Sequence, residues 1–327
     1  MRWFHLSLSS FLVTCGLAFA LLRSTGPAAS PTRLPAEPVV VAQITLHPMQ
    51  DLEWSPPDWV VDLGPATVDA AWALAEMDGD AAETTLRLNS RSAFAFDLDS
   101  GEVLLEKRPD DPYPAASLTK LVTALTVASE SPDLDERICI TPEMWPGWPG
   151  ASSKLNTGVC TRGWDLLGAA LVKSDNRAAY ALTHLAPWPS ALFVDQMNEV
   201  AAGLGMERSS FVDPSGALDD NLATARDLTK AVTMVAFHPL LGSIASAPYW
   251  DTDVGNRVRR LATTNKLAGR DDLVFLAAKT GYTDTARHCF AGVIETSTGR
   301  RIALTVLGAG RSSARWADVR RIVDRFR

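Results

Sequence analysis

Three short groups of polar residues in this chain could together carry out acyl transfer. Ser117 and Lys120 are three positions apart, which on a helix places both side chains on one face. A neutral lysine there could take the hydroxyl proton of the serine, and burial or a neighbouring cation makes a lysine neutral. The N-terminus of the helix would also favour alkoxide character on Ser117. This first group supplies a candidate nucleophile and a candidate base.

The second group is Ser174-Asp175-Asn176, which stands between two predicted helices. A hydroxyl and an amide two positions apart can both face a cleft from one loop. We expect Ser174 to relay a proton to a leaving amine. We expect Asn176 to hydrogen-bond a substrate amide and Lys120.

The third group is Lys279-Thr280-Gly281, at the end of an apolar strand. Lys279 would supply positive charge, and Thr280 could hydrogen-bond a carboxylate. Gly281 would let a substrate backbone approach the strand edge. The backbone N–H groups of Tyr282 and Ser117 could form an oxyanion hole. Each group alone is common, so the prediction depends on their combination.

In this order, the three groups resemble the signature of penicillin-binding proteins and serine β-lactamases. From about residue 89 to the end, the chain resembles the serine D-Ala-D-Ala peptidases, which are low-molecular-mass penicillin-binding proteins. Within this family it is similar to the D-alanyl-D-alanine endopeptidase (penicillin-binding protein 7) type. The segments that carry the resemblance are 114–120, 176–179, 197–206, 211–216, 224–230, 264–267, 279–283 and 288–289.

The resemblance implies a serine acyl-enzyme that acts on peptidoglycan stem peptides, with β-lactam antibiotics as inhibitors that acylate Ser117. It implies no cofactor and no metal. Asp175 departs from the pattern, because carboxypeptidase relatives usually have Gly there and the endopeptidase type has Glu. Carboxypeptidase and endopeptidase activity therefore both stay open at this point.

Three other functions fit the sequence less well. A serine β-lactamase of the class with Ser-Asp-Asn needs a Glu-x-x-x-Asn downstream, and neither Glu199 nor Glu207 has an Asn four residues later. A non-catalytic peptidoglycan-binding scaffold would not need all three groups intact. A metallopeptidase is disfavoured, since the five histidines show no His-Glu-x-x-His spacing.

The order of elements predicts an α/β (α+β) fold. A β-hairpin begins near residue 92, helices fill the middle of the chain, and three strands and a helix end it. Such an order predicts one antiparallel sheet built from both ends of the chain, with helices around it. The resemblance implies the β-lactamase/transpeptidase-like fold, which has five strands and a helical lobe. On the last helix, we expect a solvated arginine face of Arg315, Arg320, Arg321 and Arg325.

The N-terminal part reads as a targeting segment. Residues 1–22 have a positive start, an apolar run and a small-x-small site, as in a secretory signal peptide or an N-terminal anchor. Lipid attachment at Cys15 is a third possibility. Residues 23–88 are predicted to be a Pro-rich linker and residues 89–327 the catalytic domain. We expect an extracytoplasmic location, in the periplasm or cell envelope of a bacterium, and any membrane tether to be N-terminal.

Export sets the expectation for the remaining cysteines. Cys139 and Cys160 lie in two short β-branched segments that could pair antiparallel, so we predict a disulfide between them, with two buried free thiols as the alternative. Closing this loop would stabilise the fold by roughly 3 kcal/mol in the chain-entropy model. Cys289 reads as a small core residue. Trp145 and Trp148 either stack on glycan or cover the predicted cysteine hairpin.

Composition excludes several classes of protein. The chain has 327 residues, of which 46% are hydrophobic and 21% charged, and a formal net charge of −7. This length supports a full hydrophobic core. The acidic balance argues against nucleic acid as a partner, and four cysteines are too few for a disulfide-dense scaffold.

Overall fold

A computed structural model of the chain describes residues 73–74, 77–79, 86–144, 153–255 and 257–327. The predicted signal segment, most of the predicted linker, and Trp145 and Trp148 lie outside these residues.

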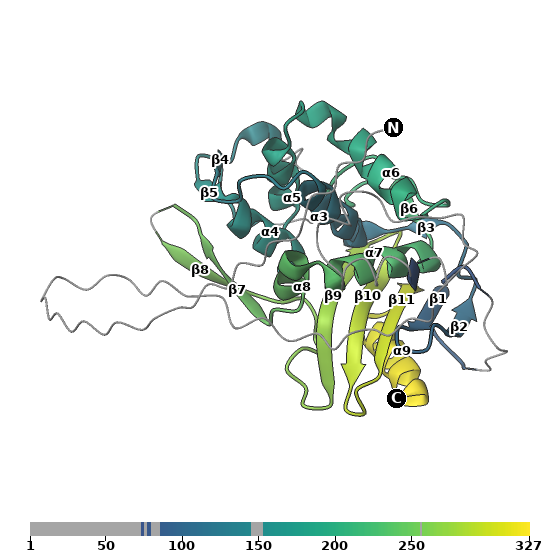
Figure 1. Cartoon of the computed structure of the whole chain (residues 1–327). Coiled ribbons are helices and arrows are strands. Elements are labelled where there is room, and N and C mark those ends of the chain that lie inside the picture. Colours follow the sequence, from purple (N-terminus) through teal and green to yellow (C-terminus); the bar gives the residue numbers. More distant parts are fainter. Residues whose placement is uncertain (1–72, 75–76, 80–85, 145–152, 256) are drawn as a thin grey trace, which may run out of the picture. The chain divides into compact units, whose positions relative to one another are not determined.

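The core of the fold is a five-stranded antiparallel sheet in the order β2-β1-β11-β10-β9 (Figure 1). The first hairpin pairs with the last strand, since Ala95 in β1 faces Leu304 in β11. This confirms the predicted sheet built from both ends of the chain. Its strands are β1 (Ser92–Asp97), β2 (Val103–Lys107), β9 (Leu273–Thr283), β10 (Arg287–Thr296) and β11 (Arg301–Ala309).

Side chains alternate between the two faces of the sheet along each strand, and each face is buried in its own apolar cluster. Phe94 and Phe96 of β1 belong to the apolar core shared with the helices. Ala93 and Ala95 belong to a second core, which Trp316 and its neighbours on the C-terminal helix cover from the other side. The strands therefore read as nearly continuous apolar runs.

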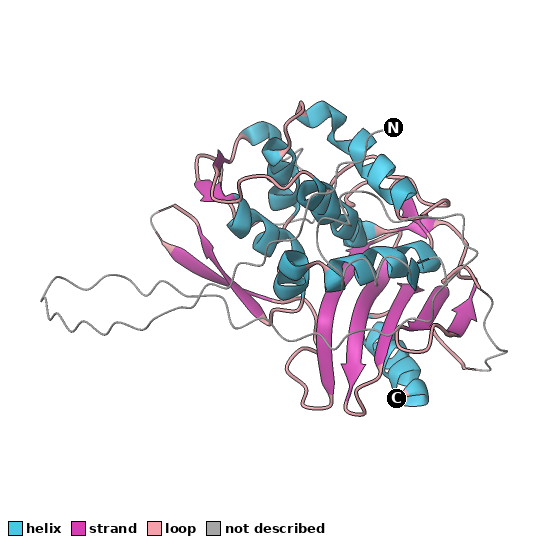
Figure 2. Ribbon diagram, in the orientation of Figure 1, coloured by secondary structure: helices cyan, strands magenta, loops and turns pink. Residues whose placement is uncertain are grey.

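Helices lie on both sides of the sheet (Figure 2). Helices α7 and α8 pack on the first face, and α9 packs on the second. The remaining helices form the predicted helical lobe next to α7. The helices are α3 (Thr119–Ser129), α4 (Gly163–Leu171), α5 (Asn176–Leu182), α6 (Phe193–Gly203), α7 (Ala225–Phe237), α8 (Pro239–Ala245) and α9 (Ser312–Phe326).

Three two-stranded ribbons complete the fold: β3 (Tyr113–Pro114) with β6 (Leu222–Ala223), β4 (Arg137–Cys139) with β5 (Cys160–Arg162), and β7 (Tyr249–Asp253) with β8 (Val258–Ala262). Cys139 and Cys160 face each other in the second ribbon, and the structure contains the disulfide between them. Helix α8 and the β7–β8 ribbon were not predicted. Strand β8 is exposed at four of its five residues. Its sequence therefore lacks the alternation of apolar and polar residues that predicts a strand.

The folded part begins before residue 89, earlier than the predicted boundary. Met77 is fully buried in the core. Arg226 of α7 donates hydrogen bonds to the carbonyls of Met77 and Gly79, and Lys230 pairs with Asp78 at 2.8 Å. Arg226 and Lys230 are both buried cations that need oxygen partners. The segment that precedes residue 89 supplies some of them.

Among the described residues, no single helix is long and apolar enough to cross a membrane. Only α7 and α8 taken together have the length and composition, and they are bent by 105° relative to each other.

Candidate active site

Ser117 lies in a tight turn directly before α3. A 3-10 turn spans Ala116–Leu118 and α3 starts at Thr119, so Ser117 precedes the regular helix and Lys120 lies in its first turn. Ala116 has a φ of 47°, a left-handed conformation that is uncommon outside glycine and that occurs at functional sites. Ser117 itself is half-buried, and its hydroxyl is therefore within reach of a ligand.

Lys120, one turn later, is fully buried and has three oxygen neighbours. Its Nζ lies 2.9 Å from Ser117 Oγ. It also donates hydrogen bonds to Asn176 Oδ1 and to the Ser215 carbonyl, both at 2.6 Å. The side chain of Lys120 thus connects the first group to the second.

Burial lowers the pKa of Lys120 to about 7, because desolvation disfavours its charged form. The carboxylates of Asp213 and Asp175 act in the opposite direction and raise the pKa, but less strongly. About half of the Lys120 side chains are therefore neutral near neutral pH. A neutral amine keeps two N–H donors and one lone pair, which suits two carbonyl acceptors and one hydroxyl donor.

The second group turns between α4 and α5. Ser174 has a φ of 63°, so this non-glycine residue also occupies the left-handed region. Asp175 is buried and caps α5, since its carboxylate accepts hydrogen bonds from the backbone N–H groups of Arg177 and Ala178. It also accepts hydrogen bonds from the Ser153 hydroxyl and the Lys154 N–H. The role of Asp175 in the fold is therefore to hold the loop.

The third group meets the second through Lys279. Its Nζ lies 2.6 Å from Ser174 Oγ and is almost fully buried. Burial, followed by the charges of Lys120 and Arg315, holds the pKa of Lys279 well below its ordinary value. The Thr280 hydroxyl donates a hydrogen bond of 2.7 Å to the Thr264 hydroxyl. The sequence placed all three groups in one site, but it did not predict the Lys279–Ser174 contact.

Gly281 lies against the turn that carries Ser117. A Cβ built on Gly281 would be 3.1 Å from the Ala115 carbonyl oxygen and 3.3 Å from Ser117 N. Its lack of a side chain therefore lets the nucleophile turn approach β9 closely, a contact that sequence reasoning attributed to substrate. The Tyr282 side chain is half exposed, stacks on His288 and hydrogen-bonds Asp284. The oxyanion role predicted for Tyr282 concerns its backbone N–H and does not involve this side chain.

Asp213 organises a loop that sequence reasoning did not assign to the site. Its buried carboxylate accepts hydrogen bonds from the N–H groups of Ser215 and Gly216 and from Asn221 Nδ2, among others. These bonds present the Ser215 carbonyl to Lys120. The only sequence signal was the resemblance over residues 211–216, which did not specify this role.

The prediction of a solvated Arg315 is wrong. This residue is 6% exposed, and its guanidinium hydrogen-bonds the carbonyls of Gly281 and Cys289 behind β9. Its charge predicts a position on the polar face of α9, but the packing of α9 on the sheet buries it. Cys289, by contrast, is the buried core residue that was predicted, and burial raises the pKa of its thiol to about 11.

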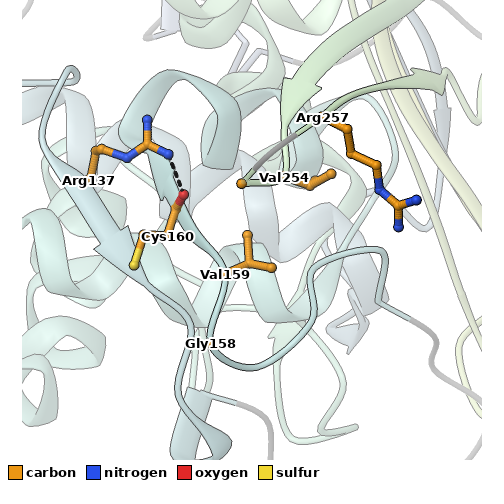
Figure 3. A pocket seen from close by; sticks show the side chains of 7 residues that line it. Arg137, Gly158, Val159, Cys160, Val254 and Arg257 are labelled. Carbon is orange, nitrogen blue, oxygen red and sulfur yellow. Dashed lines mark hydrogen bonds between the residues drawn. The ribbon is translucent and has the colours of Figure 1, made fainter.

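A cavity of about 480 Å³ lies between the β4–β5 and β7–β8 ribbons, and none of the three groups lines it (Figure 3). Arg137, at its edge, donates a hydrogen bond to the Cys160 carbonyl and pairs with Asp253. Within the described residues, no three His, Cys, Asp or Glu side chains are grouped to hold a metal ion.

A lysine-supported serine, a second serine–lysine pair and this five-stranded sheet define a serine enzyme of the penicillin-binding fold class. The structure of penicillin-binding protein D2 from Listeria monocytogenes, in a cefotaxime-bound form, has a TM-score of 0.65 and 30% identity, and it covers 74% of this chain and 98% of its own. Residues 79–311 match the family described as D-alanyl-D-alanine carboxypeptidase, and the chain belongs to this family.

Several relatives are named as endopeptidases, and two of them are 34% identical to this chain. The chain is 34% identical over 238 residues to a D-alanyl-D-alanine endopeptidase of Escherichia coli, covering 71% of this chain and 76% of that one. A D-alanyl-D-alanine endopeptidase of Pseudomonas aeruginosa is also 34% identical over 238 residues, covering 72% and 76%.

Replacing Gly216 tests the geometry of the nucleophile turn. A Cβ at Gly216 would lie 1.8 Å from the Ala116 carbonyl oxygen, so Gly216→Ala must displace the turn that holds Ser117. A displacement near 1 Å can cost ~100-fold in rate, and we expect benzylpenicillin acylation to fall by about this factor. Stopped-flow acylation kinetics would measure it.

Gly299→Ala is the matched control. Gly299 also has a positive φ, and a Cβ there would meet nothing within 4 Å. It should share the backbone strain of about 1 kcal/mol and keep the acylation rate. Equal rates in the two variants would contradict the proposed close packing at the turn.

Proposed function

We propose that this chain is a serine-type D-Ala-D-Ala peptidase that works through an acyl-enzyme on Ser117. The observation that carries the proposal is the set of contacts around Lys120. Two of its neighbours, Asn176 Oδ1 and the Ser215 carbonyl, can only accept hydrogen bonds. A neutral Lys120 therefore uses both N–H groups on them and aims its lone pair at Ser117 Oγ.

In the acylation step, Ser117 Oγ attacks the carbonyl carbon of the penultimate D-alanine, and Lys120 takes the hydroxyl proton. Negative charge develops on the substrate oxygen. The backbone N–H groups of Ser117 and Tyr282 stabilise it, as the close approach of Gly281 to Ser117 N supports.

The leaving amine then needs a proton. Ser174 passes one to it, and the 2.6 Å contact with Lys279 supplies a donor behind Ser174. Lys279 and Thr280 together orient the substrate carboxylate. Water finally hydrolyses the ester on Ser117, with Lys120 again as the base.

We also infer where the protein acts and what binds it. Residues 1–22 would export the chain or anchor it, which places the catalytic domain outside the cytoplasm next to its peptidoglycan substrate. β-Lactams would acylate Ser117 because their amide mimics the D-Ala-D-Ala bond. The cefotaxime-bound relative, which shares 30% identity, supports this inference.

Fluorescent penicillin tests the nucleophile. Wild-type protein should become covalently labelled, and Ser117→Ala should lose the label because no other hydroxyl is placed beside Lys120 in the described site. Ser243→Ala, an exposed serine of α8, is the control and should label normally. Gel fluorescence after denaturation is the measurement. Label retained by Ser117→Ala would overturn the proposed mechanism.

The pH dependence of acylation tests the base. Because the pKa of Lys120 is lowered to about 7 and its neutral form is reactive, the rate should rise with pH. The neutral fraction changes from about one tenth at pH 6 to about nine tenths at pH 8, so we expect a ~10-fold increase. Benzylpenicillin is a suitable substrate, since its carboxylate stays ionised over this range.

Asn176→Asp provides the matched comparison for this profile. It places a carboxylate where Lys120 now meets an amide oxygen, which favours the charged ammonium. The midpoint of the rate profile should therefore move to higher pH. A midpoint that does not move would show that another group titrates.

For the bond cleaved, we infer the endopeptidase reaction, which the two endopeptidase relatives at 34% identity support. Cross-linked dimer muropeptides should be split into monomers faster than D-alanine is released from pentapeptide monomers. Chromatography of the products at matched enzyme concentration measures both rates. Faster release of D-alanine would instead assign the carboxypeptidase reaction.

A further inference from the structure

Arg315 is a buried cation directly behind the third group. It projects from α9 and is 6% exposed. In the described part of the chain, no carboxylate forms an ion pair with it, whereas Arg321 on the same helix pairs with Asp318 at 3.0 Å. Its Nε atom is also buried without a hydrogen-bond partner. Such a cation costs stability, so its position requires an explanation.

Arg315 contacts two backbone carbonyls, and one of them belongs to the peptide between Gly281 and Tyr282. Its Nη1 donates to the Cys289 carbonyl at 3.0 Å and to the Gly281 carbonyl at 3.3 Å. Gly281 and Cys289 face each other in the β9–β10 ladder. Because Nη1 of Arg315 lies on its oxygen, the Gly281 carbonyl points toward α9.

The planarity of the peptide bond determines where the other end of this unit points. The C=O of Gly281 and the N–H of Tyr282 belong to one planar group and point in opposite directions. The Tyr282 N–H is therefore directed away from Arg315 and α9. Among the described strands β9 is the last of the sheet, so its outer side has no strand partner there. Ser117 N lies next to the same peptide, since a Cβ built on Gly281 would be 3.3 Å from it.

We propose that Arg315 is a positioning residue that strengthens the oxyanion hole through the Gly281–Tyr282 peptide. A cation held on the carbonyl orients this peptide and polarises it, which makes the Tyr282 N–H a stronger donor. The proposal rests on the proposed acylation of Ser117. It adds a residue that touches neither the substrate nor Ser117.

The cost of burying Arg315 fits this role. Burial lowers its pKa to about 10, so the guanidinium still carries its charge near neutral pH. The negative charge that best compensates it is absent from the resting site and appears in the tetrahedral intermediate. An interaction of this kind lowers the barrier without tightening ground-state binding.

The test compares Arg315→Met, Arg315→Lys and the control Arg321→Met. Three probes are used: benzylpenicillin, its methyl ester, which lacks the free carboxylate, and phenylboronic acid, which forms a tetrahedral anion on an active-site serine. Loss of a whole oxyanion donor costs about 100-fold or more, so loss of its polarisation should cost less, ~10-fold. Acylation rates are expressed per active site titrated.

We expect Arg315→Met to slow acylation by both penicillins by the same factor and to weaken phenylboronic acid binding equally. Arg315→Lys should recover part of each loss, and Arg321→Met should match the wild type. The thermal midpoint of Arg315→Met should be unchanged or higher, because an unpaired buried charge is removed.

Each other outcome overturns the proposal in a distinct way. Wild-type rates in Arg315→Met would remove the role altogether. A loss seen with benzylpenicillin but not with the ester or the boronic acid would show that Arg315 binds the substrate carboxylate. A lower thermal midpoint with no recovery in Arg315→Lys would make its role structural. Penicillin labelling of Ser117→Ala would instead refute the proposed function itself.

Discussion

The site depends on one buried amine that must hold or release a single proton. Lys120 is surrounded by the Ser117 hydroxyl, the Asn176 amide oxygen and the Ser215 carbonyl, and each belongs to a different segment. With the proton, Lys120 satisfies all three acceptors. Without it, the two obligate acceptors are still satisfied and the lone pair meets Ser117. Both protonation states are therefore fully hydrogen-bonded, which allows the proton to move without rearrangement of the protein.

This arrangement constrains the fold around it. The Ser215 carbonyl reaches Lys120 because Asp213 gathers its loop, and that loop fits because Gly216 leaves room for the Ala116 carbonyl. On the opposite side, Gly281 lets β9 approach the same turn. Two glycines thus allow backbone from the helical lobe and from the sheet to meet at one serine. The left-handed conformation of Ala116 is the local cost of this meeting.

The sequence was sufficient for the parts of the site that use standard residue types in short motifs. The pairing of Ser117 with Lys120 is predicted by the three groups in combination and by the resemblance they carry, and the sheet is predicted by the order of strands and helices. The Lys279–Ser174 contact and the Asp213 loop were not predictable, because each depends on long-range packing that no local pattern encodes. Arg315 was assigned wrongly for the same reason. A charged residue on an amphipathic helix is predicted to face solvent unless it is known which strands the helix packs against.

Three basic side chains are buried at or directly behind the site. Lys120, Lys279 and Arg315 are all less than a tenth exposed, and the charges of the other two lower the pKa of Lys279. Positive charge gathered away from water is destabilising: burial lowers the pKa values of Lys120 and Lys279, and neighbouring positive charge lowers that of Lys279 further. An anionic substrate relieves this repulsion, first with its carboxylate and then with the oxyanion. In the proposed chemistry, the stability that the resting protein gives up is returned in the transition state, where it lowers the barrier.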